Sequence, residues 1–250
     1  GEGWYDADTY ASISTAPIVD IVPGSSQYKF MNWTTTDMAE ITDETAPSTT
    51  VLMDKGKTVT ANYIIQYKIT FDATGLGIDA TGTVVTIDTV NYGLGSLPVS
   101  FWWDSSSSHT FSFTPIIDAG PGKQYIWNST SGLSTLRDGS ITVSVSGSII
   151  GHYKTQYYLT VSSDYGTTGG EGWYYDGDIA YATVNPLTVP GTTGVQYVFT
   201  YWSGDASGNT SPSNPITMNG PKTAVANWKT QYSVTFDHTG LDSSASSAVV

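Results

Sequence analysis

The sequence predicts an all-β protein, built as a rod-like tandem array of small β-rich modules that alternate with an immunoglobulin-like β-sandwich. Thr, Val, Ile and aromatic residues favour strands and are abundant, while 26 Gly and 11 Pro mark frequent turns. No segment shows a convincing 3.6-residue period, so we expect minimal helix. A third observation, a phrase that recurs along the chain, defines the modules.

The recurring phrase is a Gln-Tyr pair followed by alternating large apolar and polar residues, the pattern of a half-buried strand. It begins at Gln66, Gln156 and Gln231. These seams divide the chain into four parts. We expect a small module lacking its first strand at 1–65, an Ig-like sandwich at 66–155, a complete small module at 156–230 and the opening strands of a further Ig-like module at 231–250.

The two small modules are copies of each other. Residues 1–5 return as residues 170–174, an offset of 169 that holds as far as Trp33 and Trp202. At the next Gln-Tyr pair the offset has fallen to 165. The difference lies in the polar stretch 34–50, where a surface loop can vary in length.

Short strands separated by Gly-rich and Pro-rich turns fill each module. In the complete small module we expect strands at 157–162, 180–184, 196–202, 216–218 and 223–228. In the middle module we expect strands at 67–71, 83–87, 99–103, 109–115, 123–127, 140–145 and 149–153, a pattern typical of an Ig-like sandwich.

The seams contain no flexible linker. Thr155 and Thr230 are followed at once by the next strand, with no Gly/Ser-rich or Pro-rich spacer. A direct strand-to-strand junction restricts swivelling, so we expect a stiff rod that spans distance.

Composition excludes several classes of function. The net charge is −13 with nine Lys plus Arg, which disfavours nucleic acid and anionic membranes as partners. Without cysteine, the chain has neither disulfides nor thiolate metal sites. No apolar run reaches the roughly 18–20 residues that span a bilayer. The chain opens in mid-pattern without a signal segment, so we expect an excerpt or a mature product.

Four stretches of the complete small module carry a family resemblance: residues 157–161, 172–174, 197–205 and 218–228. They resemble the divergent internalin B-repeat (InlB B-repeat) family, small β-rich extracellular repeats found in tandem on bacterial and archaeal surface proteins. The resemblance covers 156–230 and most of 1–65, although residues 33–37 of the first copy depart from the Trp-Ser-Gly-Asp turn at Trp202. It implies cell-surface architecture or adhesion and brings no catalytic residues.

The middle module resembles Ig-like repeats of archaeal cell-surface proteins. The motifs that carry this resemblance are weaker: Phe-Asp-x-Thr-Gly-Leu at 71–76 and Trp-Asn-Ser-Thr-Ser-Gly-Leu at 127–133. This family also implies a structural or adhesive role at the cell surface.

An active site finds no support in the sequence. His109, His152 and His238 stand outside any recognised catalytic motif, and the position of His238 holds Ala73 in the other copy. We therefore predict no enzyme, no catalytic residue and no certain cofactor.

Calcium is the better site hypothesis, because Ca²⁺ is bound by six to eight oxygen ligands of the kind that turn Asp residues supply. The candidate ligands follow the Gly-Trp-Tyr motif of both small modules or lie in the polar turn of the second. We interpret them more readily as turn residues that bond to their own backbone. The candidates are Asp6, Asp8, Asp176, Asp178 and Asp205.

The tryptophans divide into two groups. Trp4, Trp33, Trp173 and Trp202 recur between the copies, as core positions should. Trp102 and Trp103 are neighbours on an expected strand, so one of them faces outward and could stack on a sugar or contact a partner.

Three Asn-x-Ser/Thr sequons permit glycosylation without indicating it. They begin at Asn32, Asn128 and Asn209, and Asn32 adjoins an expected core residue.

These observations predict a non-enzymatic extracellular repeat protein that forms part of a cell-surface stalk, sheath, S-layer-like coat or fibre. Its partners are neighbouring repeats or copies of itself, and its modules stabilise one another by stacking. Two alternatives remain open: a filament subunit that polymerises by strand exchange between chains, and a carbohydrate-binding adhesin that presents Trp102 and Trp103 to glycans.

Overall fold

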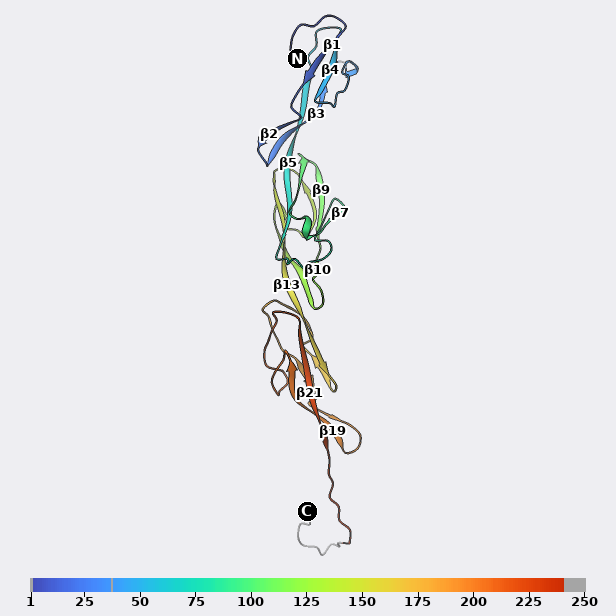
Figure 1. Ribbon diagram of the computed structural model, residues 1–250, viewed down its shortest axis with the longest axis vertical. Helices are drawn as coiled ribbons and strands as arrows, with labels where there is room; N and C mark the ends of the chain where they lie inside the picture. Colours follow the sequence, from blue (N-terminus) through green and yellow to red (C-terminus); the bar gives the residue numbers. More distant parts are fainter. Residues whose placement is uncertain (1, 37, 241–250) are drawn as a thin grey trace. The chain divides into compact units, whose positions relative to one another are not determined.

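The computed structural model describes residues 2–36 and 38–240, so the last ten residues of the expected fourth module lie outside it. The described residues form strands and two 3₁₀ turns, Met38–Glu40 and Leu94–Ser96, and contain no α-helix (Figure 1). The prediction of an all-β chain with minimal helix is therefore confirmed. The chain divides into two compact units, residues 1–118 with 125–153, and residues 119–124 with 154–250.

The first small module lies in the first unit. β1 (Thr9–Ser14) pairs with β4 (Ser48–Met53), and β2 (Ile18–Val22) pairs with β3 (Ser26–Thr34), which pairs in turn with β5 (Thr60–Thr74). Its core is small because few large apolar side chains point inward. The buried members are Ala11, Phe30, Trp33, Ile41 and Val51.

The same unit contains a sandwich of two sheets. One sheet joins the second half of β5 to β8 (Val99–Asp104) and to the first half of β13 (Gly147–Ser163), and β13 also pairs with β11 (Lys123–Gly132). The other has the strand order β12 (Asp138–Thr142), β9 (Ser108–Phe113), β6 (Val85–Ile87) and β7 (Val90–Tyr92). A core rich in aromatic residues packs between them. Whether this sandwich is Ig-like stays a prediction.

In the second unit, the C-terminal half of β13 pairs with β15 (Gly172–Tyr175) on one side and with β21 (Lys222–Tyr232) in parallel on the other. β21 continues the sheet through β19 (Val195–Gly204) to β18 (Thr188–Pro190). Two short ladders complete the unit: β14 (Thr167–Gly169) with β17 (Thr183–Asn185), and β16 (Ile179–Ala180) with β20 (Ile216–Thr217).

The two small modules repeat their pairing register as well as their sequence. Ala11 pairs with Val51 in the first, and the equivalent Ala180 pairs with Ile216 in the second. Both carry a bulge at the same place, between Phe30 and Asn32 and between Phe199 and Tyr201. Phe30 and Phe199 each pack against a buried tryptophan at a ring distance of 5.4 Å.

Strands pass without interruption through the predicted seams. β5 continues across residue 66, β13 across residue 156 and β21 as far as Tyr232. The absence of a linker is therefore confirmed. Beyond Tyr232, residues 233–240 form no strand and Val234 and Phe236 are exposed, so the opening strands expected at 231–250 stay a prediction.

Two of the four tryptophans expected in the core are outside it. Trp33 and Trp202 are buried, but Trp173 is 40% exposed and Trp4 104% exposed. The reason is the alternation of side chains along β15: its neighbour Tyr174 packs on the core, so Trp173 must face the other side.

Candidate functional site

One hydrogen-bonding arrangement recurs at all three seams. The residue two places after each seam glutamine donates its backbone N–H to a carbonyl in a turn nearby. Lys68 donates to Ser25, Tyr158 to Gly122 and Ser233 to Gly194, each with an N···O distance of 2.9 Å. A backbone bond of this kind does not depend on the side chain, so it holds although Lys, Tyr and Ser occupy the position.

A pair of glutamine side chains accompanies each backbone bond. The turn glutamine donates its amide N–H to the amide oxygen of the seam glutamine, at distances of 2.9, 2.9 and 2.7 Å. We call the backbone bond and the glutamine pair together the seam clasp. The three pairs are Gln27 with Gln66, Gln124 with Gln156, and Gln196 with Gln231.

The first clasp is buried and carries further bonds. Gln27 and Gln66 are both buried, and Gln66 also donates its amide N–H to Asp104 Oδ1 at 2.7 Å. The hydroxyls of Ser25 and Ser146 lie 2.5 Å apart beside them. Because a buried amide without partners would cost free energy, this network specifies one alignment of the two modules along β5.

Glycine permits the turns that form the clasps. Gly24, Gly122 and Gly194 have φ values of 74°, 71° and 79°, in the left-handed region that side chains rarely adopt. A Cβ on Gly122 would also lie 2.9 Å from Cβ of Pro221. The glycine at this turn is therefore needed both for its backbone conformation and for the space it leaves.

The sequence reasoning missed the turn half of the clasp. It used the Gln-Tyr pair only as a strand marker at the seams. The same dipeptide occurs at 27–28, 124–125 and 196–197, which are the turn partners. The sequence contains six Gln-Tyr pairs, which alternate between turn and seam positions. This alternation could have indicated that each turn pair has a seam partner.

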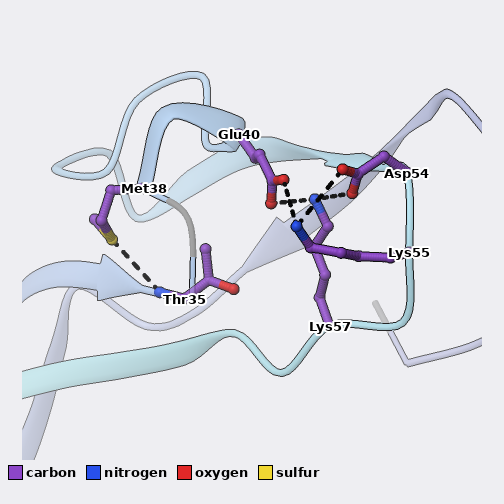
Figure 2. A network of polar contacts seen from close by, with 6 residues as sticks. All are labelled: Thr35, Met38, Glu40, Asp54, Lys55 and Lys57. Carbon is purple, nitrogen blue, oxygen red and sulfur yellow. Dashed lines mark hydrogen bonds and ion pairs between the residues drawn. The ribbon is translucent and has the colours of Figure 1, made fainter.

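A cluster of four charged side chains lies in the first small module, where the long loop returns to the sheet (Figure 2). Lys57 Nζ contacts a carboxylate oxygen of Glu40 and lies 2.6 Å from Asp54 Oδ1, while Lys55 Nζ lies 3.4 Å from Glu40. The Lys57 side chain is only 1% exposed and that of Glu40 9%. The backbone N–H of Thr35 bonds Met38 Sδ at 3.4 Å in the same loop (Figure 2).

The cluster shifts two pKa values. Burial by itself lowers the pKa of Lys57, but its hydrogen bonds to Asp54 and Glu40 outweigh burial and raise the pKa. The hydrogen bond from Lys57 lowers the pKa of the Asp54 carboxyl below its ordinary 3.8. An ammonium held fully charged between carboxylates is a poor nucleophile, so the cluster fixes the loop and offers no catalytic group.

The equivalent lysine of the second module has a simpler partner. Lys222 Nζ lies 3.3 Å from Asp205 Oδ1, and Asp205 Oδ2 accepts the backbone N–H of Thr223 at 2.8 Å. The bond from Thr223, followed by Lys222, lowers the pKa of Asp205 against the opposing effect of burial.

The predicted calcium ligands lie in turns. Asp178 Oδ2 accepts the backbone N–H of Tyr175 at 2.9 Å, and the carbonyl of Asp6 accepts both the N–H and the hydroxyl of Thr9. Asp8 has φ 61°, and Asp176 donates its N–H to Thr155. No group of three His, Cys, Asp or Glu side chains in the described residues could hold a metal ion. Calcium binding stays a prediction.

Three residues of the sandwich are arranged in the order of a catalytic triad, which the sequence did not reveal. His109 lies 2.5 Å from Asp88 Oδ2 and 2.9 Å from the hydroxyl of Ser107, and its ring stacks on Trp103 at 3.6 Å. The hydroxyl of Ser107 donates its proton to the carbonyl of Asp104 at 2.6 Å, so it does not donate to His109. The arrangement closes a turn and does not activate a nucleophile.

The remaining predicted residues differ in accessibility. Trp103 is 9% exposed and belongs to the sandwich core, whereas Trp102 is half-buried on the opposite face, so glycan contact stays a prediction for Trp102. Asn128 and Asn209 are exposed, and Asn32 is half-buried against Asn62. His152 bonds the hydroxyls of Thr74 and Ser131.

Comparison with known proteins identifies one family. The family described as the divergent InlB B-repeat domain matches residues 3–66 and 157–232, which together are more than half of the chain. No curated protein and no solved structure matches the chain. No helix in the described residues is long and apolar enough to cross a membrane.

Proposed function

The chain belongs to the divergent InlB B-repeat family, and we propose that it serves as a structural spacer in a surface stalk, sheath, coat or fibre outside the cell. Repeat proteins of this family are typically surface-associated, and stability in such arrays comes from contacts between neighbouring repeats. The spacer positions whatever the rest of the array carries at a distance from the surface.

The observation that carries the proposal is the seam clasp. The same backbone bond and the same glutamine pair occur at all three seams, in modules of two different kinds. A chain that needed flexible modules would be expected to place Gly/Ser-rich linkers there. Instead β5 and β13 continue through the seams.

The third clasp supports the same conclusion. Gln196 and Gln231 bond to each other at 2.7 Å in an exposed position, where no described residue supplies the role that Asp104 has at the first seam. The third seam clasp is thus formed within the second small module and the residues directly after it.

Labelling of intact source cells tests the location. An antibody raised against the 250-residue chain is expected to bind unpermeabilised cells, with an antibody against a ribosomal protein as the negative control. Labelling that requires permeabilisation would place the chain inside the cell and remove the proposal.

A further inference from the structure

The outer edge of β2 in the first small module is open. β2 is the last strand of its sheet, and among the described strands only β3 pairs with it (Figure 1). All five of its residues are exposed, so neither face of the strand is covered. Four of the five are Ile or Val, with exposed fractions between 42% and 53%. An edge strand that is open and apolar on both faces is a site for pairing with another chain.

The pairing with β3 determines which backbone groups face the open edge. Phe30 donates its N–H to the carbonyl of Pro17 at 2.8 Å, so these two residues form a hydrogen-bonded pair of the antiparallel ladder. Hydrogen-bonded pairs alternate along such a ladder with pairs that exchange no bond. Val19 therefore bonds to β3, whereas Ile18 and Asp20 direct their N–H and C=O groups away from it. The open edge presents two donors and two acceptors.

The second small module has the same edge in a protected form. β18 is likewise the last strand of its sheet, so an open edge at this place is common to both modules. Pro190 lies opposite Gln196 in β18. Asp20 holds the same register position in the first module, opposite Gln27. Proline has no N–H, and it is one of the residues that keep edge strands from pairing with other chains. β18 also has three residues where β2 has five.

We propose that β2 is a self-association edge, along which two copies of the chain pair their β2 strands antiparallel about a two-fold axis at Val19. Because the axis makes one edge serve both partners, the outward groups of one strand must face those of the other. With the axis at Val19, Ile18 of each copy exchanges its backbone bonds with Asp20 of the other. The inference goes beyond the spacer function, because it adds a lateral contact between chains.

Charge and strand length distinguish this register from its neighbours. An axis at Asp20 would place two carboxylates directly opposite each other, which destabilises a strand pair. An axis at Ile18 would bring Asp20 opposite Ala16, which lies outside β2. With the axis at Val19, each Asp20 lies opposite an isoleucine, and the two carboxylates are diagonal neighbours roughly 7–8 Å apart.

The face that carries Val19 is apolar across the proposed pair. Val19 lies opposite Tyr28 in its own sheet, and the two side chains are 43% and 41% exposed. The Tyr28 ring packs edge-on against Tyr63 at a centroid distance of 6.3 Å, so it is already held in place in the single chain. The two valines meet at the axis, each flanked by a tyrosine. Aromatic and β-branched neighbours of this kind stabilise adjacent strands.

Two substitutions at one position test the backbone bonds. Asp20→Pro removes an outward N–H, and the fold is expected to tolerate it because Pro190 occupies that position in the second module. Asp20→Asn keeps the N–H and removes the like charges. Sedimentation equilibrium in about 0.15 M salt, which screens the repulsion between two acidic chains, measures the dissociation constant of the dimer.

We expect Asp20→Pro to raise this dissociation constant at least about tenfold and Asp20→Asn to lower it. An unchanged unfolding midpoint verifies that each variant is folded. A parent chain that stays monomeric at millimolar concentration would overturn the proposal. So would a dimer that Asp20→Pro leaves intact, because the association would then use another surface.

Cysteine trapping tests the register in a chain that has no native cysteine. Val19→Cys brings two thiols together at the axis, in a pair that exchanges no backbone bond and whose Cα atoms are about 4.5 Å apart, within disulfide reach. Oxidised glutathione is the oxidant. One thiolate attacks it to form a mixed disulfide and release glutathione, and the second thiolate then displaces the other glutathione to join the two chains.

Two matched variants serve as controls for chance collisions. Val189→Cys places the thiol at the equivalent register position of β18, beside Pro190. Ile21→Cys places it on β2 itself at a similar exposure, 42% against 43%, but away from the axis. We expect Val19→Cys to form disulfide-linked dimers at least about tenfold faster than either control. Equal rates in the three variants would overturn the proposal.

Discussion

Lys57 and Lys222 occupy the same position in two copies of one module, yet their surroundings differ. Lys57 is enclosed by Glu40 and Asp54. Lys222 has one carboxylate partner, Asp205. Comparing the two lysines therefore measures how much burial changes the contribution of an ion pair to the stability of its module.

Replacing each lysine by methionine keeps the apolar stem and removes the charge. Lys57→Met removes the closer partner of the nearly buried Glu40 and leaves it only the exposed Lys55 at 3.4 Å, so we expect a clear loss of stability in the first module. Lys222→Met breaks a solvent-accessible pair and should cost no more than about 1 kcal/mol. Hydrogen exchange at Ala11 and Val51, compared with Ala180 and Ile216, reports the two modules separately.

The pH dependence of the same comparison follows from the lowered pKa of Asp54. A carboxylate with a depressed pKa contributes stability that is present above its ordinary pKa, 3.8, and is lost as the pH falls through the folded value. The difference between the parent chain and Lys57→Met should therefore stay constant from pH 7 to about 4 and shrink below that. A difference that is the same at pH 7 and pH 2 would contradict the assignment.

Sequence reasoning located some single residues and missed others, for identifiable reasons. Trp33 and Trp202 recur in sequence and are buried, but recurrence alone did not separate them from Trp4 and Trp173, which also recur and are exposed. The full cluster around Lys57 could not be found by comparing the copies, because Asp54 and Lys55 stand where the second copy has Asn219 and Gly220. The burial of Lys57 between carboxylates depends on tertiary packing, so it cannot be predicted from the spacing of charged residues in the sequence.

At the scale of elements, the Gln-Tyr phrase was a reliable predictor. It placed strands that cross the seams in β5 and β13, because a period-2 pattern directly reports a half-buried strand. After Tyr232 the pattern is equally good, but residues 233–240 form no strand and Val234 and Phe236 are exposed, so the opening strands of a further module stay a prediction. In the sandwich, the strand that carries the Gln66-Tyr67 pattern is β5, and it pairs with β8 and β13. A strand pattern therefore predicts a strand only where partners exist.

The first and third clasps offer a second matched pair. Gln66→Leu removes a buried amide and leaves the side chains of Gln27 and Asp104 without their bonds, so it should cost about 1–3 kcal/mol in unfolding free energy. Gln231→Leu removes the exposed equivalent and should change stability by less than about 0.5 kcal/mol. Denaturant unfolding measures both. Equal costs would show that the first clasp contributes nothing beyond a surface contact.

At the scale of the whole molecule, the chain is a series of small cores joined by shared strands. The first core has five buried apolar residues, and the two sheets of the sandwich meet over a larger one rich in aromatics. Small modules gain stability from their neighbours when the contact between them is ordered. The clasps place a backbone hydrogen bond and a glutamine pair at each seam, which is why they carry the proposal that the chain spans distance.

Amide hydrogen exchange at the clasps tests this central claim most directly. The N–H group of Lys68 donates to Ser25 in the first clasp, that of Tyr158 to Gly122 in the second, and that of Ser233 to Gly194 in the exposed third clasp. If the seams are ordered joints, Lys68 and Tyr158 should be protected as strongly as Ile69 and Leu159 in the cores beside them. Exchange of Lys68 and Tyr158 at nearly the rate of an unstructured peptide would mean that the seams open freely, and the chain would then be a flexible string of modules.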